Sequence, residues 1–126
     1  MVKLNIPEPV VLKNDAPCKG LKLLSDGELM IIGLESGVVK VVNSKTLQVL
    51  GEQQLMQAPI LKIEQVLQAI IVQFKDQKGS LNVYQLSKEF TFTEVLQIQT
   101  YSSGFTLFAA TTLIDEEENN YITLVT

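Results

Sequence analysis

The sequence predicts an all-β fold, and three observations support this prediction. Short apolar runs rich in Val, Ile, Leu and Phe recur along the 126 residues, with turn-forming residues between them. Few stretches carry the 3.6-residue period of an amphipathic helix. The pattern of strands and turns also restarts at intervals of about 40 residues, which indicates an internal structural repeat.

The first repeat is expected to contain four strands. They span Leu21 to Leu24, Glu28 to Leu34, Val38 to Val42 and Thr46 to Leu50. Asp26-Gly27, between the first two strands, is a hairpin signal because such turns need a residue that tolerates positive φ. The second strand is apolar at most positions, which indicates burial on both of its faces. The repeat therefore predicts a four-stranded antiparallel meander.

The second repeat has the same organisation. It follows the segment Gly51 to Gln57, which we expect to continue the previous outer strand into a loop. Its strands span Ile60 to Ile63, Gln68 to Phe74, Ser80 to Leu86 and Phe90 to Ile98. The pair Ile31-Ile32 recurs roughly 40 residues later as Ile70-Ile71, so the two repeats align strand by strand.

A third repeat begins near the end of the sequence. Gly104 to Ala110 and Tyr121 to Val125 are expected strands, and an acidic run separates them. The sequence stops two strands into this repeat. A repeat of about 40 residues with four strands is typical of a β-propeller blade of the WD-repeat type.

The segment Ala16 to Leu50 resembles a WD-repeat blade in its motifs. It has Asp26-Gly27 before the second strand, Gly33 to Gly37 in the following turn and Val39 to Asn43 in the third strand. Val42-Asn43 stands where the family usually has Trp-Asp, and the family's Gly-His pair near the blade start is absent. The buried His-to-Asp hydrogen-bond network of the family is therefore not carried over to this chain.

The third repeat carries a narrower resemblance. Gly104-Phe105, the acidic insertion and Tyr121 to Val125 are similar to the small WD-repeat family that includes the ASTRA-complex propeller subunit of fungi. The resemblance implies a non-catalytic scaffold that mediates protein–protein interactions within a multiprotein assembly. It further implies an assembly of the ASTRA type, which acts on chromatin and in kinase maturation.

These patterns predict that residues 1–126 form the N-terminal part of one β-propeller domain, with about two and a half to three four-stranded antiparallel blades. Its parts are a closing strand at 9–14, a first blade at 16–57, a second at 58–100 and the start of a third at 101–126. A closed propeller needs about 4 to 8 blades. We expect the remaining blades of the same propeller to be supplied as a second polypeptide after a break in a loop following Thr126.

Composition excludes several classes of chemistry. The chain has no His and no Trp, and all ten of its basic residues are lysines. It therefore lacks the residues for histidine acid–base catalysis, histidine metal ligation and arginine clamps on phosphate. We expect no enzyme activity, no cofactor, no bound metal and no direct contact with nucleic acid.

Cys18 is the single cysteine, so no internal disulfide can form and an intracellular location, nuclear or cytoplasmic, is expected. We expect its thiol to be a buried or half-buried spectator. No apolar run approaches the roughly 20 residues of a membrane helix, so no membrane partner is expected. The net charge of −4 is concentrated in one segment.

That segment contains Asp115, Glu116, Glu117 and Glu118, and without these four acids the remaining acids and lysines balance. We interpret it as a candidate loop for binding a basic protein partner, because loops on rigid scaffolds carry most binding residues. The alternative is a solvated loop between strands. The aromatic residues are expected to pack between blades, and the main ones are Tyr84, Phe90, Phe92, Phe105 and Phe108.

Two alternatives to the scaffold hypothesis remain open from the sequence. One is a ligand-binding or catalytic propeller whose active residues lie in blades outside this sequence. The other is a complete small β-barrel or sandwich that serves as a binding module, against which the unfinished third repeat counts.

We predict that neither zinc nor ATP binds this chain with submicromolar affinity, because it has no His, no Arg and no phosphate-binding loop. Isothermal titration of the protein with each ligand should give no heat of specific binding. A submicromolar site for either ligand would contradict the prediction.

Overall fold

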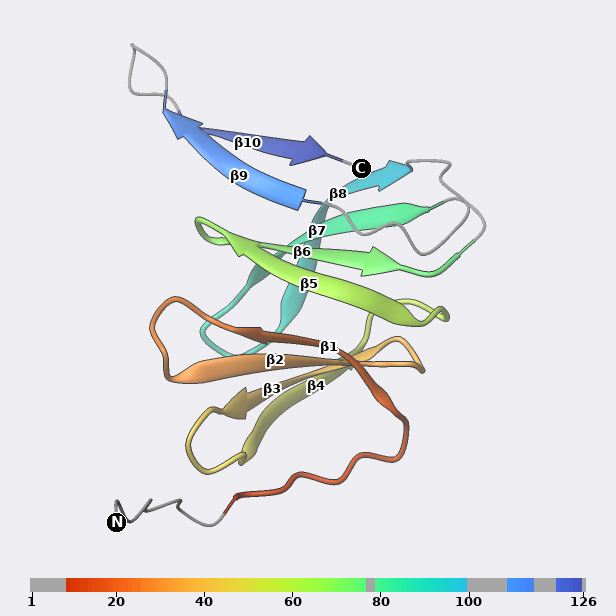
Figure 1. The fold of residues 1–126 in the computed structure, drawn as a ribbon, viewed down its shortest axis with the longest axis vertical. Helices are drawn as coiled ribbons and strands as arrows, with labels where there is room; N and C mark the ends of the chain where they lie inside the picture. The colour runs from red at the N-terminus through yellow and green to blue at the C-terminus, as the bar shows by residue number, and fades with distance from the viewer. Residues whose placement is uncertain (1–8, 77–78, 100–108, 115–119, 126) are drawn as a thin grey trace, which may run out of the picture.

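The computed structural model describes residues 9–76, 79–99, 109–114 and 120–125, and it describes side chains up to residue 99. Within these ranges the chain forms ten strands and no helix (Figure 1). The strands are β1 (Cys18–Leu23), β2 (Leu29–Leu34), β3 (Val38–Asn43), β4 (Val49–Gln54), β5 (Ile60–Val66), β6 (Ala69–Phe74), β7 (Ser80–Leu86), β8 (Phe92–Gln99), β9 (Ala109–Ile114) and β10 (Asn120–Val125).

The strands form three separate antiparallel sheets that follow one another along the chain. One four-stranded sheet has the order β1-β2-β3-β4, the next has the order β5-β6-β7-β8, and β9 pairs with β10. The two predicted meanders are thereby confirmed. These strands do not form a closed barrel, because no hydrogen-bonded ladder joins one sheet to the next. We call β1–β4 blade 1 and β5–β8 blade 2.

Blade 1 and blade 2 repeat the same local geometry. The inner strand of each has a bulge, between Cys18 and Gly20 in β1 and between Ile60 and Lys62 in β5. In each blade a proline carbonyl before the inner strand accepts a hydrogen bond from the residue that follows the second strand. The bonds are Glu35 N to Pro17 O at 2.9 Å and Lys75 N to Pro59 O at 2.8 Å. The two sheets are therefore two copies of one structural unit.

The outer strands begin later than the sequence predicted, because side chains close the preceding turns. Oδ1 of Asn43 accepts hydrogen bonds from the backbone N–H groups of Lys45 and Thr46, so strand β4 begins at Val49. In blade 2, Oγ of Ser87 accepts from Glu89 and Thr91, and β8 begins at Phe92. Asx and ST turns of this kind compete with strand pairing and shift its first residue. The expected strand starts at Thr46 and Phe90 are therefore corrected.

Three glycines between strands have positive φ: 74° at Gly27, 87° at Gly37 and 61° at Gly79. Gly37 is also constrained by packing, since a Cβ there would overlap the backbone carbonyl oxygen of Met56. At Gly27 a Cβ would meet open space. The turn between β2 and β3 therefore needs glycine for two reasons, and the turn between β1 and β2 for one.

The main core lies between the two blades. Its largest part is a cluster to which blade 1 contributes Ile31, Val39 and Val41, and blade 2 contributes Ile60, Ile63, Ile70, Val72, Phe74, Tyr84 and Phe92. A second cluster of Val66, Ile71 and Leu81 lies on the other face of blade 2, on the side of β9 and β10 in Figure 1. A third lies on the face of blade 1 that points away from blade 2. Both blades are therefore apolar on both faces.

Residues 9–14, the expected closing strand, are not assigned to a strand and pair with no sheet in the described chain. Leu12 of this segment and Ala16, two residues after it, pack on the third cluster. The partner strands that we expect for this segment are not in this sequence, so its role as a closing strand stays a prediction.

We predict that Gly37→Ala lowers the free energy of unfolding by about 3 kcal/mol, because it combines a disfavoured φ with steric overlap. The matched variant Gly27→Ala has a similar φ and free space, so it should lose about 1 kcal/mol. Equilibrium denaturation of both variants checks the difference. Equal losses would show that the contact with Met56 does not constrain this turn.

Candidate protein-interaction surfaces

The expected acidic loop, Asp115, Glu116, Glu117 and Glu118, lies outside the described residues, as do Phe105 and Phe108. Three of the five aromatic residues expected between blades are described. Tyr84 and Phe92 are buried in the core between the blades, with their rings edge to face at 6.1 Å between centroids, and Phe90 packs against the same cluster. The packing role of these three residues is confirmed.

The thiol of Cys18 is exposed, so the expectation of a buried or half-buried cysteine is wrong. Cys18 is the first residue of β1, which forms one edge of its sheet, and it precedes the bulge at Gly20. A residue at the start of an edge strand has a neighbouring strand on one side only. The Sγ atom lies 3.5 Å from the carbonyl oxygen of Gly20.

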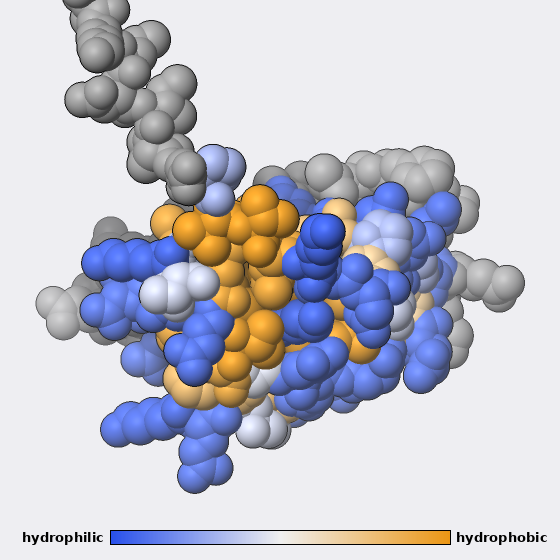
Figure 2. All heavy atoms as spheres, turned by 90° about the horizontal axis from the view of Figure 1, so that it is seen from below, coloured by the Kyte–Doolittle hydropathy of each residue, from blue (hydrophilic) through white to orange (hydrophobic). Residues whose placement is uncertain are grey.

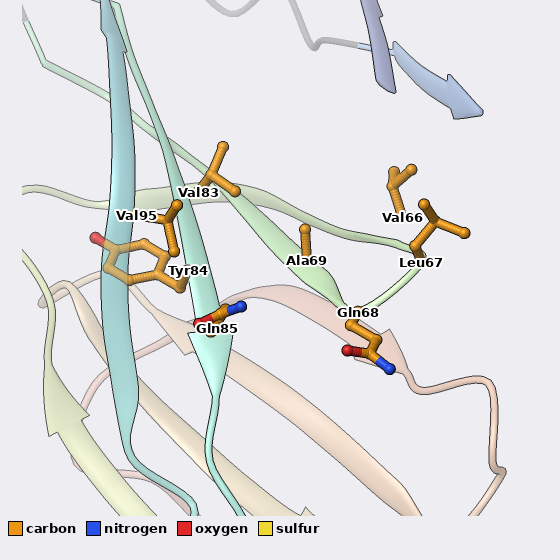
Figure 3. A pocket seen from close by; sticks show the side chains of 8 residues that line it. All are labelled: Val66, Leu67, Gln68, Ala69, Val83, Tyr84, Gln85 and Val95. Atoms are coloured by element: carbon orange, nitrogen blue, oxygen red, sulfur yellow. The ribbon is translucent and has the colours of Figure 1, made fainter. Parts of the chain in front are cut away.

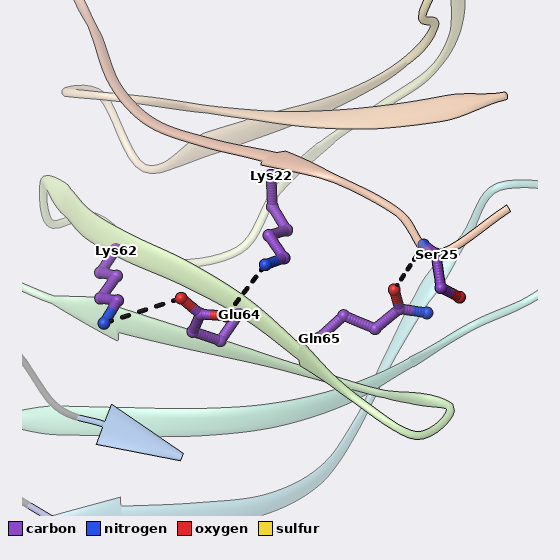
Figure 4. Close-up of polar contacts among 5 residues, drawn as sticks. All are labelled: Lys22, Ser25, Lys62, Glu64 and Gln65. Carbon is purple, nitrogen blue, oxygen red and sulfur yellow. Dashed lines mark hydrogen bonds and ion pairs between the residues drawn. The ribbon is translucent and has the colours of Figure 1, made fainter. Parts of the chain in front are cut away.

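Polar contacts join the two inner strands where the blades meet (Figure 4). The ammonium of Lys22 on β1 lies 3.1 Å from the carboxylate of Glu64 on β5, and Lys62 lies 3.6 Å from the same carboxylate. Just after β1, the backbone N–H of Ser25 donates to Oε1 of Gln65 at 2.8 Å. These side chains are only partly buried, so they contribute little to stability and mainly align the two inner strands with each other.

The side chain of Gln53 makes a second junction, between the outer strands. Its Nε2 donates to the carbonyl oxygen of Phe92 at 3.0 Å, and its Oε1 accepts from the N–H of Phe92 at 2.9 Å. The amide thus pairs with the first residue of β8 as a neighbouring strand would. Close by, a Cβ at Gly51 would lie 2.8 Å from Phe90, so the backbone of β4 contacts the turn of blade 2. No pattern in the sequence indicates this role of Gln53.

The face of blade 2 that contacts blade 1 carries a polar cluster in which Asn82 and Tyr84 are buried. Nδ2 of Asn82 donates to the hydroxyl of Tyr84 at 3.0 Å and to the carboxylate of Glu94 at 2.9 Å. Burial raises the pKa of Tyr84; the hydrogen bond from Asn82 partly opposes this change, and the nearby charge of Glu94 adds to it. The phenol is therefore neutral at physiological pH, and the cluster fixes side-chain positions in the core.

An open hollow of about 580 Å³ lies on blade 2 (Figure 3). Its lining is mostly aliphatic, with two glutamine amides and one tyrosine, and the described residues around it are Val66, Leu67, Gln68, Ala69, Val83, Tyr84, Gln85 and Val95. None of these described side chains carries a charge at neutral pH. Val66 and Val83 also belong to the apolar cluster on that face, so the hollow is a continuation of a packing surface.

The face of blade 1 opposite blade 2 carries an apolar band. Figure 2 shows this band from the blade 1 end, with polar residues on either side. Its buried members are Ile32, Leu34 and Val42, and Leu12, Ala16, Met30, Val38 and Leu47 pack around them.

Lys40 lies within this band. It pairs with Ile32 of β2 and Glu52 of β4, and residues directly opposite one another share a face of the sheet. In the sequence, Lys40 stands out because it interrupts the four valines of Val38 to Val42.

Among the residues that the structure describes, no three His, Cys, Asp or Glu side chains are placed so that they could hold a metal ion. The same part of the chain contains no helix long and apolar enough to cross a membrane.

Comparison with known proteins identifies the fold. No protein-family profile matches the sequence, and no curated protein matches it significantly. Among solved structures, the β-propeller domain of Myceliophteria thermophila Cps50 (Swd1) matches 67% of the chain at 9% identity with a TM-score of 0.61. Saccharomyces cerevisiae Sqt1 matches 91% of the chain at 12% identity with a TM-score of 0.64.

The chain spans 29% of the first of these structures and 30% of the second. At these identities the likeness is one of fold. It confirms the expected fold class, an all-β partial propeller in which blade 1 and blade 2 are consecutive four-stranded blades.

We predict that Gln53→Ala lowers the free energy of unfolding by about 2 kcal/mol, because it leaves the buried N–H of Phe92 without its acceptor. Gln97→Ala serves as the control, since it truncates an exposed glutamine on β8 and should change stability by less than about 0.5 kcal/mol. Denaturation curves of the two variants are compared directly. If they coincide, Gln53 does not join the blades.

Proposed function

We propose that this chain is part of a WD-repeat scaffold that has no catalytic activity and holds other protein subunits in a multiprotein assembly. The observation that carries the proposal is the stacking of two four-stranded blades around one shared core, in the manner of the solved propellers that the chain resembles. Such stacking fixes the sheets and leaves their turns and outer edges exposed. Loops on rigid scaffolds are the usual place for binding residues.

More narrowly, the assembly is of the ASTRA type, with a role in chromatin regulation or kinase maturation. This part of the proposal rests on the third repeat, where Gly104-Phe105, the acidic insertion and Tyr121 to Val125 are similar to that family. A nuclear or cytoplasmic location agrees with the single cysteine.

The acidic loop from Asp115 to Glu118 is the proposed contact for a basic surface of a partner subunit. Four adjacent carboxylates attract such a surface over about 10 Å at moderate ionic strength, and they raise its rate of association. The remaining partners are the other blades of the same propeller.

Affinity purification of the tagged protein from its native cells, followed by quantitative mass spectrometry, tests the proposal. We expect other subunits to co-purify. We also expect the fourfold variant with Asp115→Asn and Glu→Gln at 116, 117 and 118 to lose at least one basic partner by about tenfold, because its charge attraction is removed.

The matched control neutralises Asp15, Glu28, Glu35 and Glu89 in the same way. These four acids are exposed in blade 1, blade 2 and the N-terminal segment, so the net charge changes equally and the partners should be retained. Equal retention by both variants would contradict the role of the acidic loop. Recovery of the tagged protein without other subunits would contradict the scaffold.

A further inference from the structure

The interface between blade 1 and blade 2 shows what the outer face of blade 1 is built to contact. On blade 2, the face toward blade 1 is formed by Ile70, Val72 and Phe74 of β6 and by Ser80, Asn82 and Tyr84 of β7, and every one of these residues is buried. The strand positions align them with Met30, Ile32 and Leu34 of β2 and with Val38, Lys40 and Val42 of β3. The expected match of Ile31-Ile32 with Ile70-Ile71 is thereby corrected by one residue, because Ile31 and Ile71 hold the same place in the two ladders. The outer face of blade 1 is therefore the same kind of surface.

In blade 2, the structure shows what covers the corresponding face. Blade 1 covers it, through Ile31 of β2 and Val39 and Val41 of β3. β-Branched aliphatic side chains of a sheet fill the grooves between the facing strands. The outer face of blade 1 keeps the same pattern of aliphatic side chains on adjacent strands, so a sheet with the same chemistry fits it.

Lys40 adds a requirement that blade 2 does not have. Its aligned residue, Asn82, is 2% exposed and donates to the carboxylate of Glu94. Lys40 is 9% exposed, and its ammonium forms no ion pair within the described chain. When a blade covers this face, the ammonium leaves water. A buried unpaired ammonium is strongly unfavourable, so the covering surface has to supply an anion.

One carboxylate of blade 1 competes for this role. Glu52 lies opposite Lys40 in the β3–β4 ladder, and it is exposed on the outermost strand. The two charged groups are more than 4.0 Å apart. Ile32, the other cross-strand neighbour of Lys40, carries no charge. Neither cross-strand neighbour of Lys40 therefore supplies a paired anion, and the covering blade is the remaining source.

We propose that the outer face of blade 1 receives the last blade of the same propeller, and that a carboxylate of that blade pairs with Lys40. The inference rests on the propeller part of the proposed function and adds the chemistry of one specific contact. The source is the same propeller because the matched part of this chain covers less than a third of each of the two solved structures. Lys40 would then select the correct closing face, because an aliphatic face without an acid leaves its charge unpaired.

Zero-length carbodiimide cross-linking of the native protein, with all its bound polypeptides retained, tests the pairing. The reagent joins amines to carboxylates that are in contact, and mass spectrometry identifies the linked peptides. We expect Lys40 to be linked to an aspartate or glutamate in a strand of the same propeller outside residues 1–126. Acetylation before denaturation should modify Lys45, which lies in an exposed turn, at least tenfold more than Lys40.

Four results would overturn the proposal: a link from Lys40 only to Glu52, a link to the N-terminal segment or a second copy of this chain, a link to an unrelated subunit, or acetylation of Lys40 as fast as Lys45. The cross-link reports on blade packing, whereas partner recovery by the acidic-loop variant reports on the scaffold. Either can therefore fail while the other holds.

Variants of the native protein give an independent measurement. Lys40→Met keeps the apolar stem and removes the charge, so the carboxylate of the covering blade is left buried and unpaired. We expect at least a tenfold increase in the fraction of open or unfolded protein for Lys40→Met, a larger increase for Lys40→Glu, and no change for Lys45→Met. If Lys40→Met is neutral or stabilising, Lys40 has no buried partner and the proposal is wrong.

Discussion

The packing of blade 1 against blade 2 is the interaction on which the rest of this structure depends. The backbone of blade 1 comes close to blade 2 because Gly20 and Gly33 lack side chains. A Cβ at Gly33 would lie 2.6 Å from Cγ2 of Ile60, and one at Gly20 would lie 3.2 Å from the same atom. Ile60 and Ile63 fill the space that the glycines leave. Close packing of this kind fixes the angle between neighbouring sheets, since protein interiors contain few voids.

Burial on both faces follows from this stacking. The middle strands of each blade lie between two apolar layers, so β2 and β6 are apolar at nearly every position. A four-stranded sheet with two apolar faces is not stable in isolation, and each blade relies on its neighbours as repeat units do. The positions open for recognition are then the turns, the outer strands and the end faces. On the outer face of blade 1, the proposed pairing of Lys40 with a carboxylate would make such an end face selective.

Much of the fold could be predicted from the sequence, because the apolar runs and turn residues recur at the period of a blade. The first residues of the outer strands could not be predicted. Asn43 and Ser87 close the preceding turns through side-chain hydrogen bonds that compete with strand pairing. The role of Gln53 could not be predicted because its partner, Phe92, is 39 positions away in another sheet. The exposure of Cys18 depends on its place at an edge strand. The role of the acidic loop stays a prediction.

Native-state hydrogen exchange at the backbone amide of Phe92 tests the central claim most directly. This N–H donates to the side chain of Gln53 in the other blade, so its protection reports on contact between the blades. If the blades pack as described, it exchanges at least a hundredfold more slowly than in an unstructured peptide, and Gln53→Ala removes most of that protection. Exchange as fast as in the peptide would show that the two sheets do not share this core in solution.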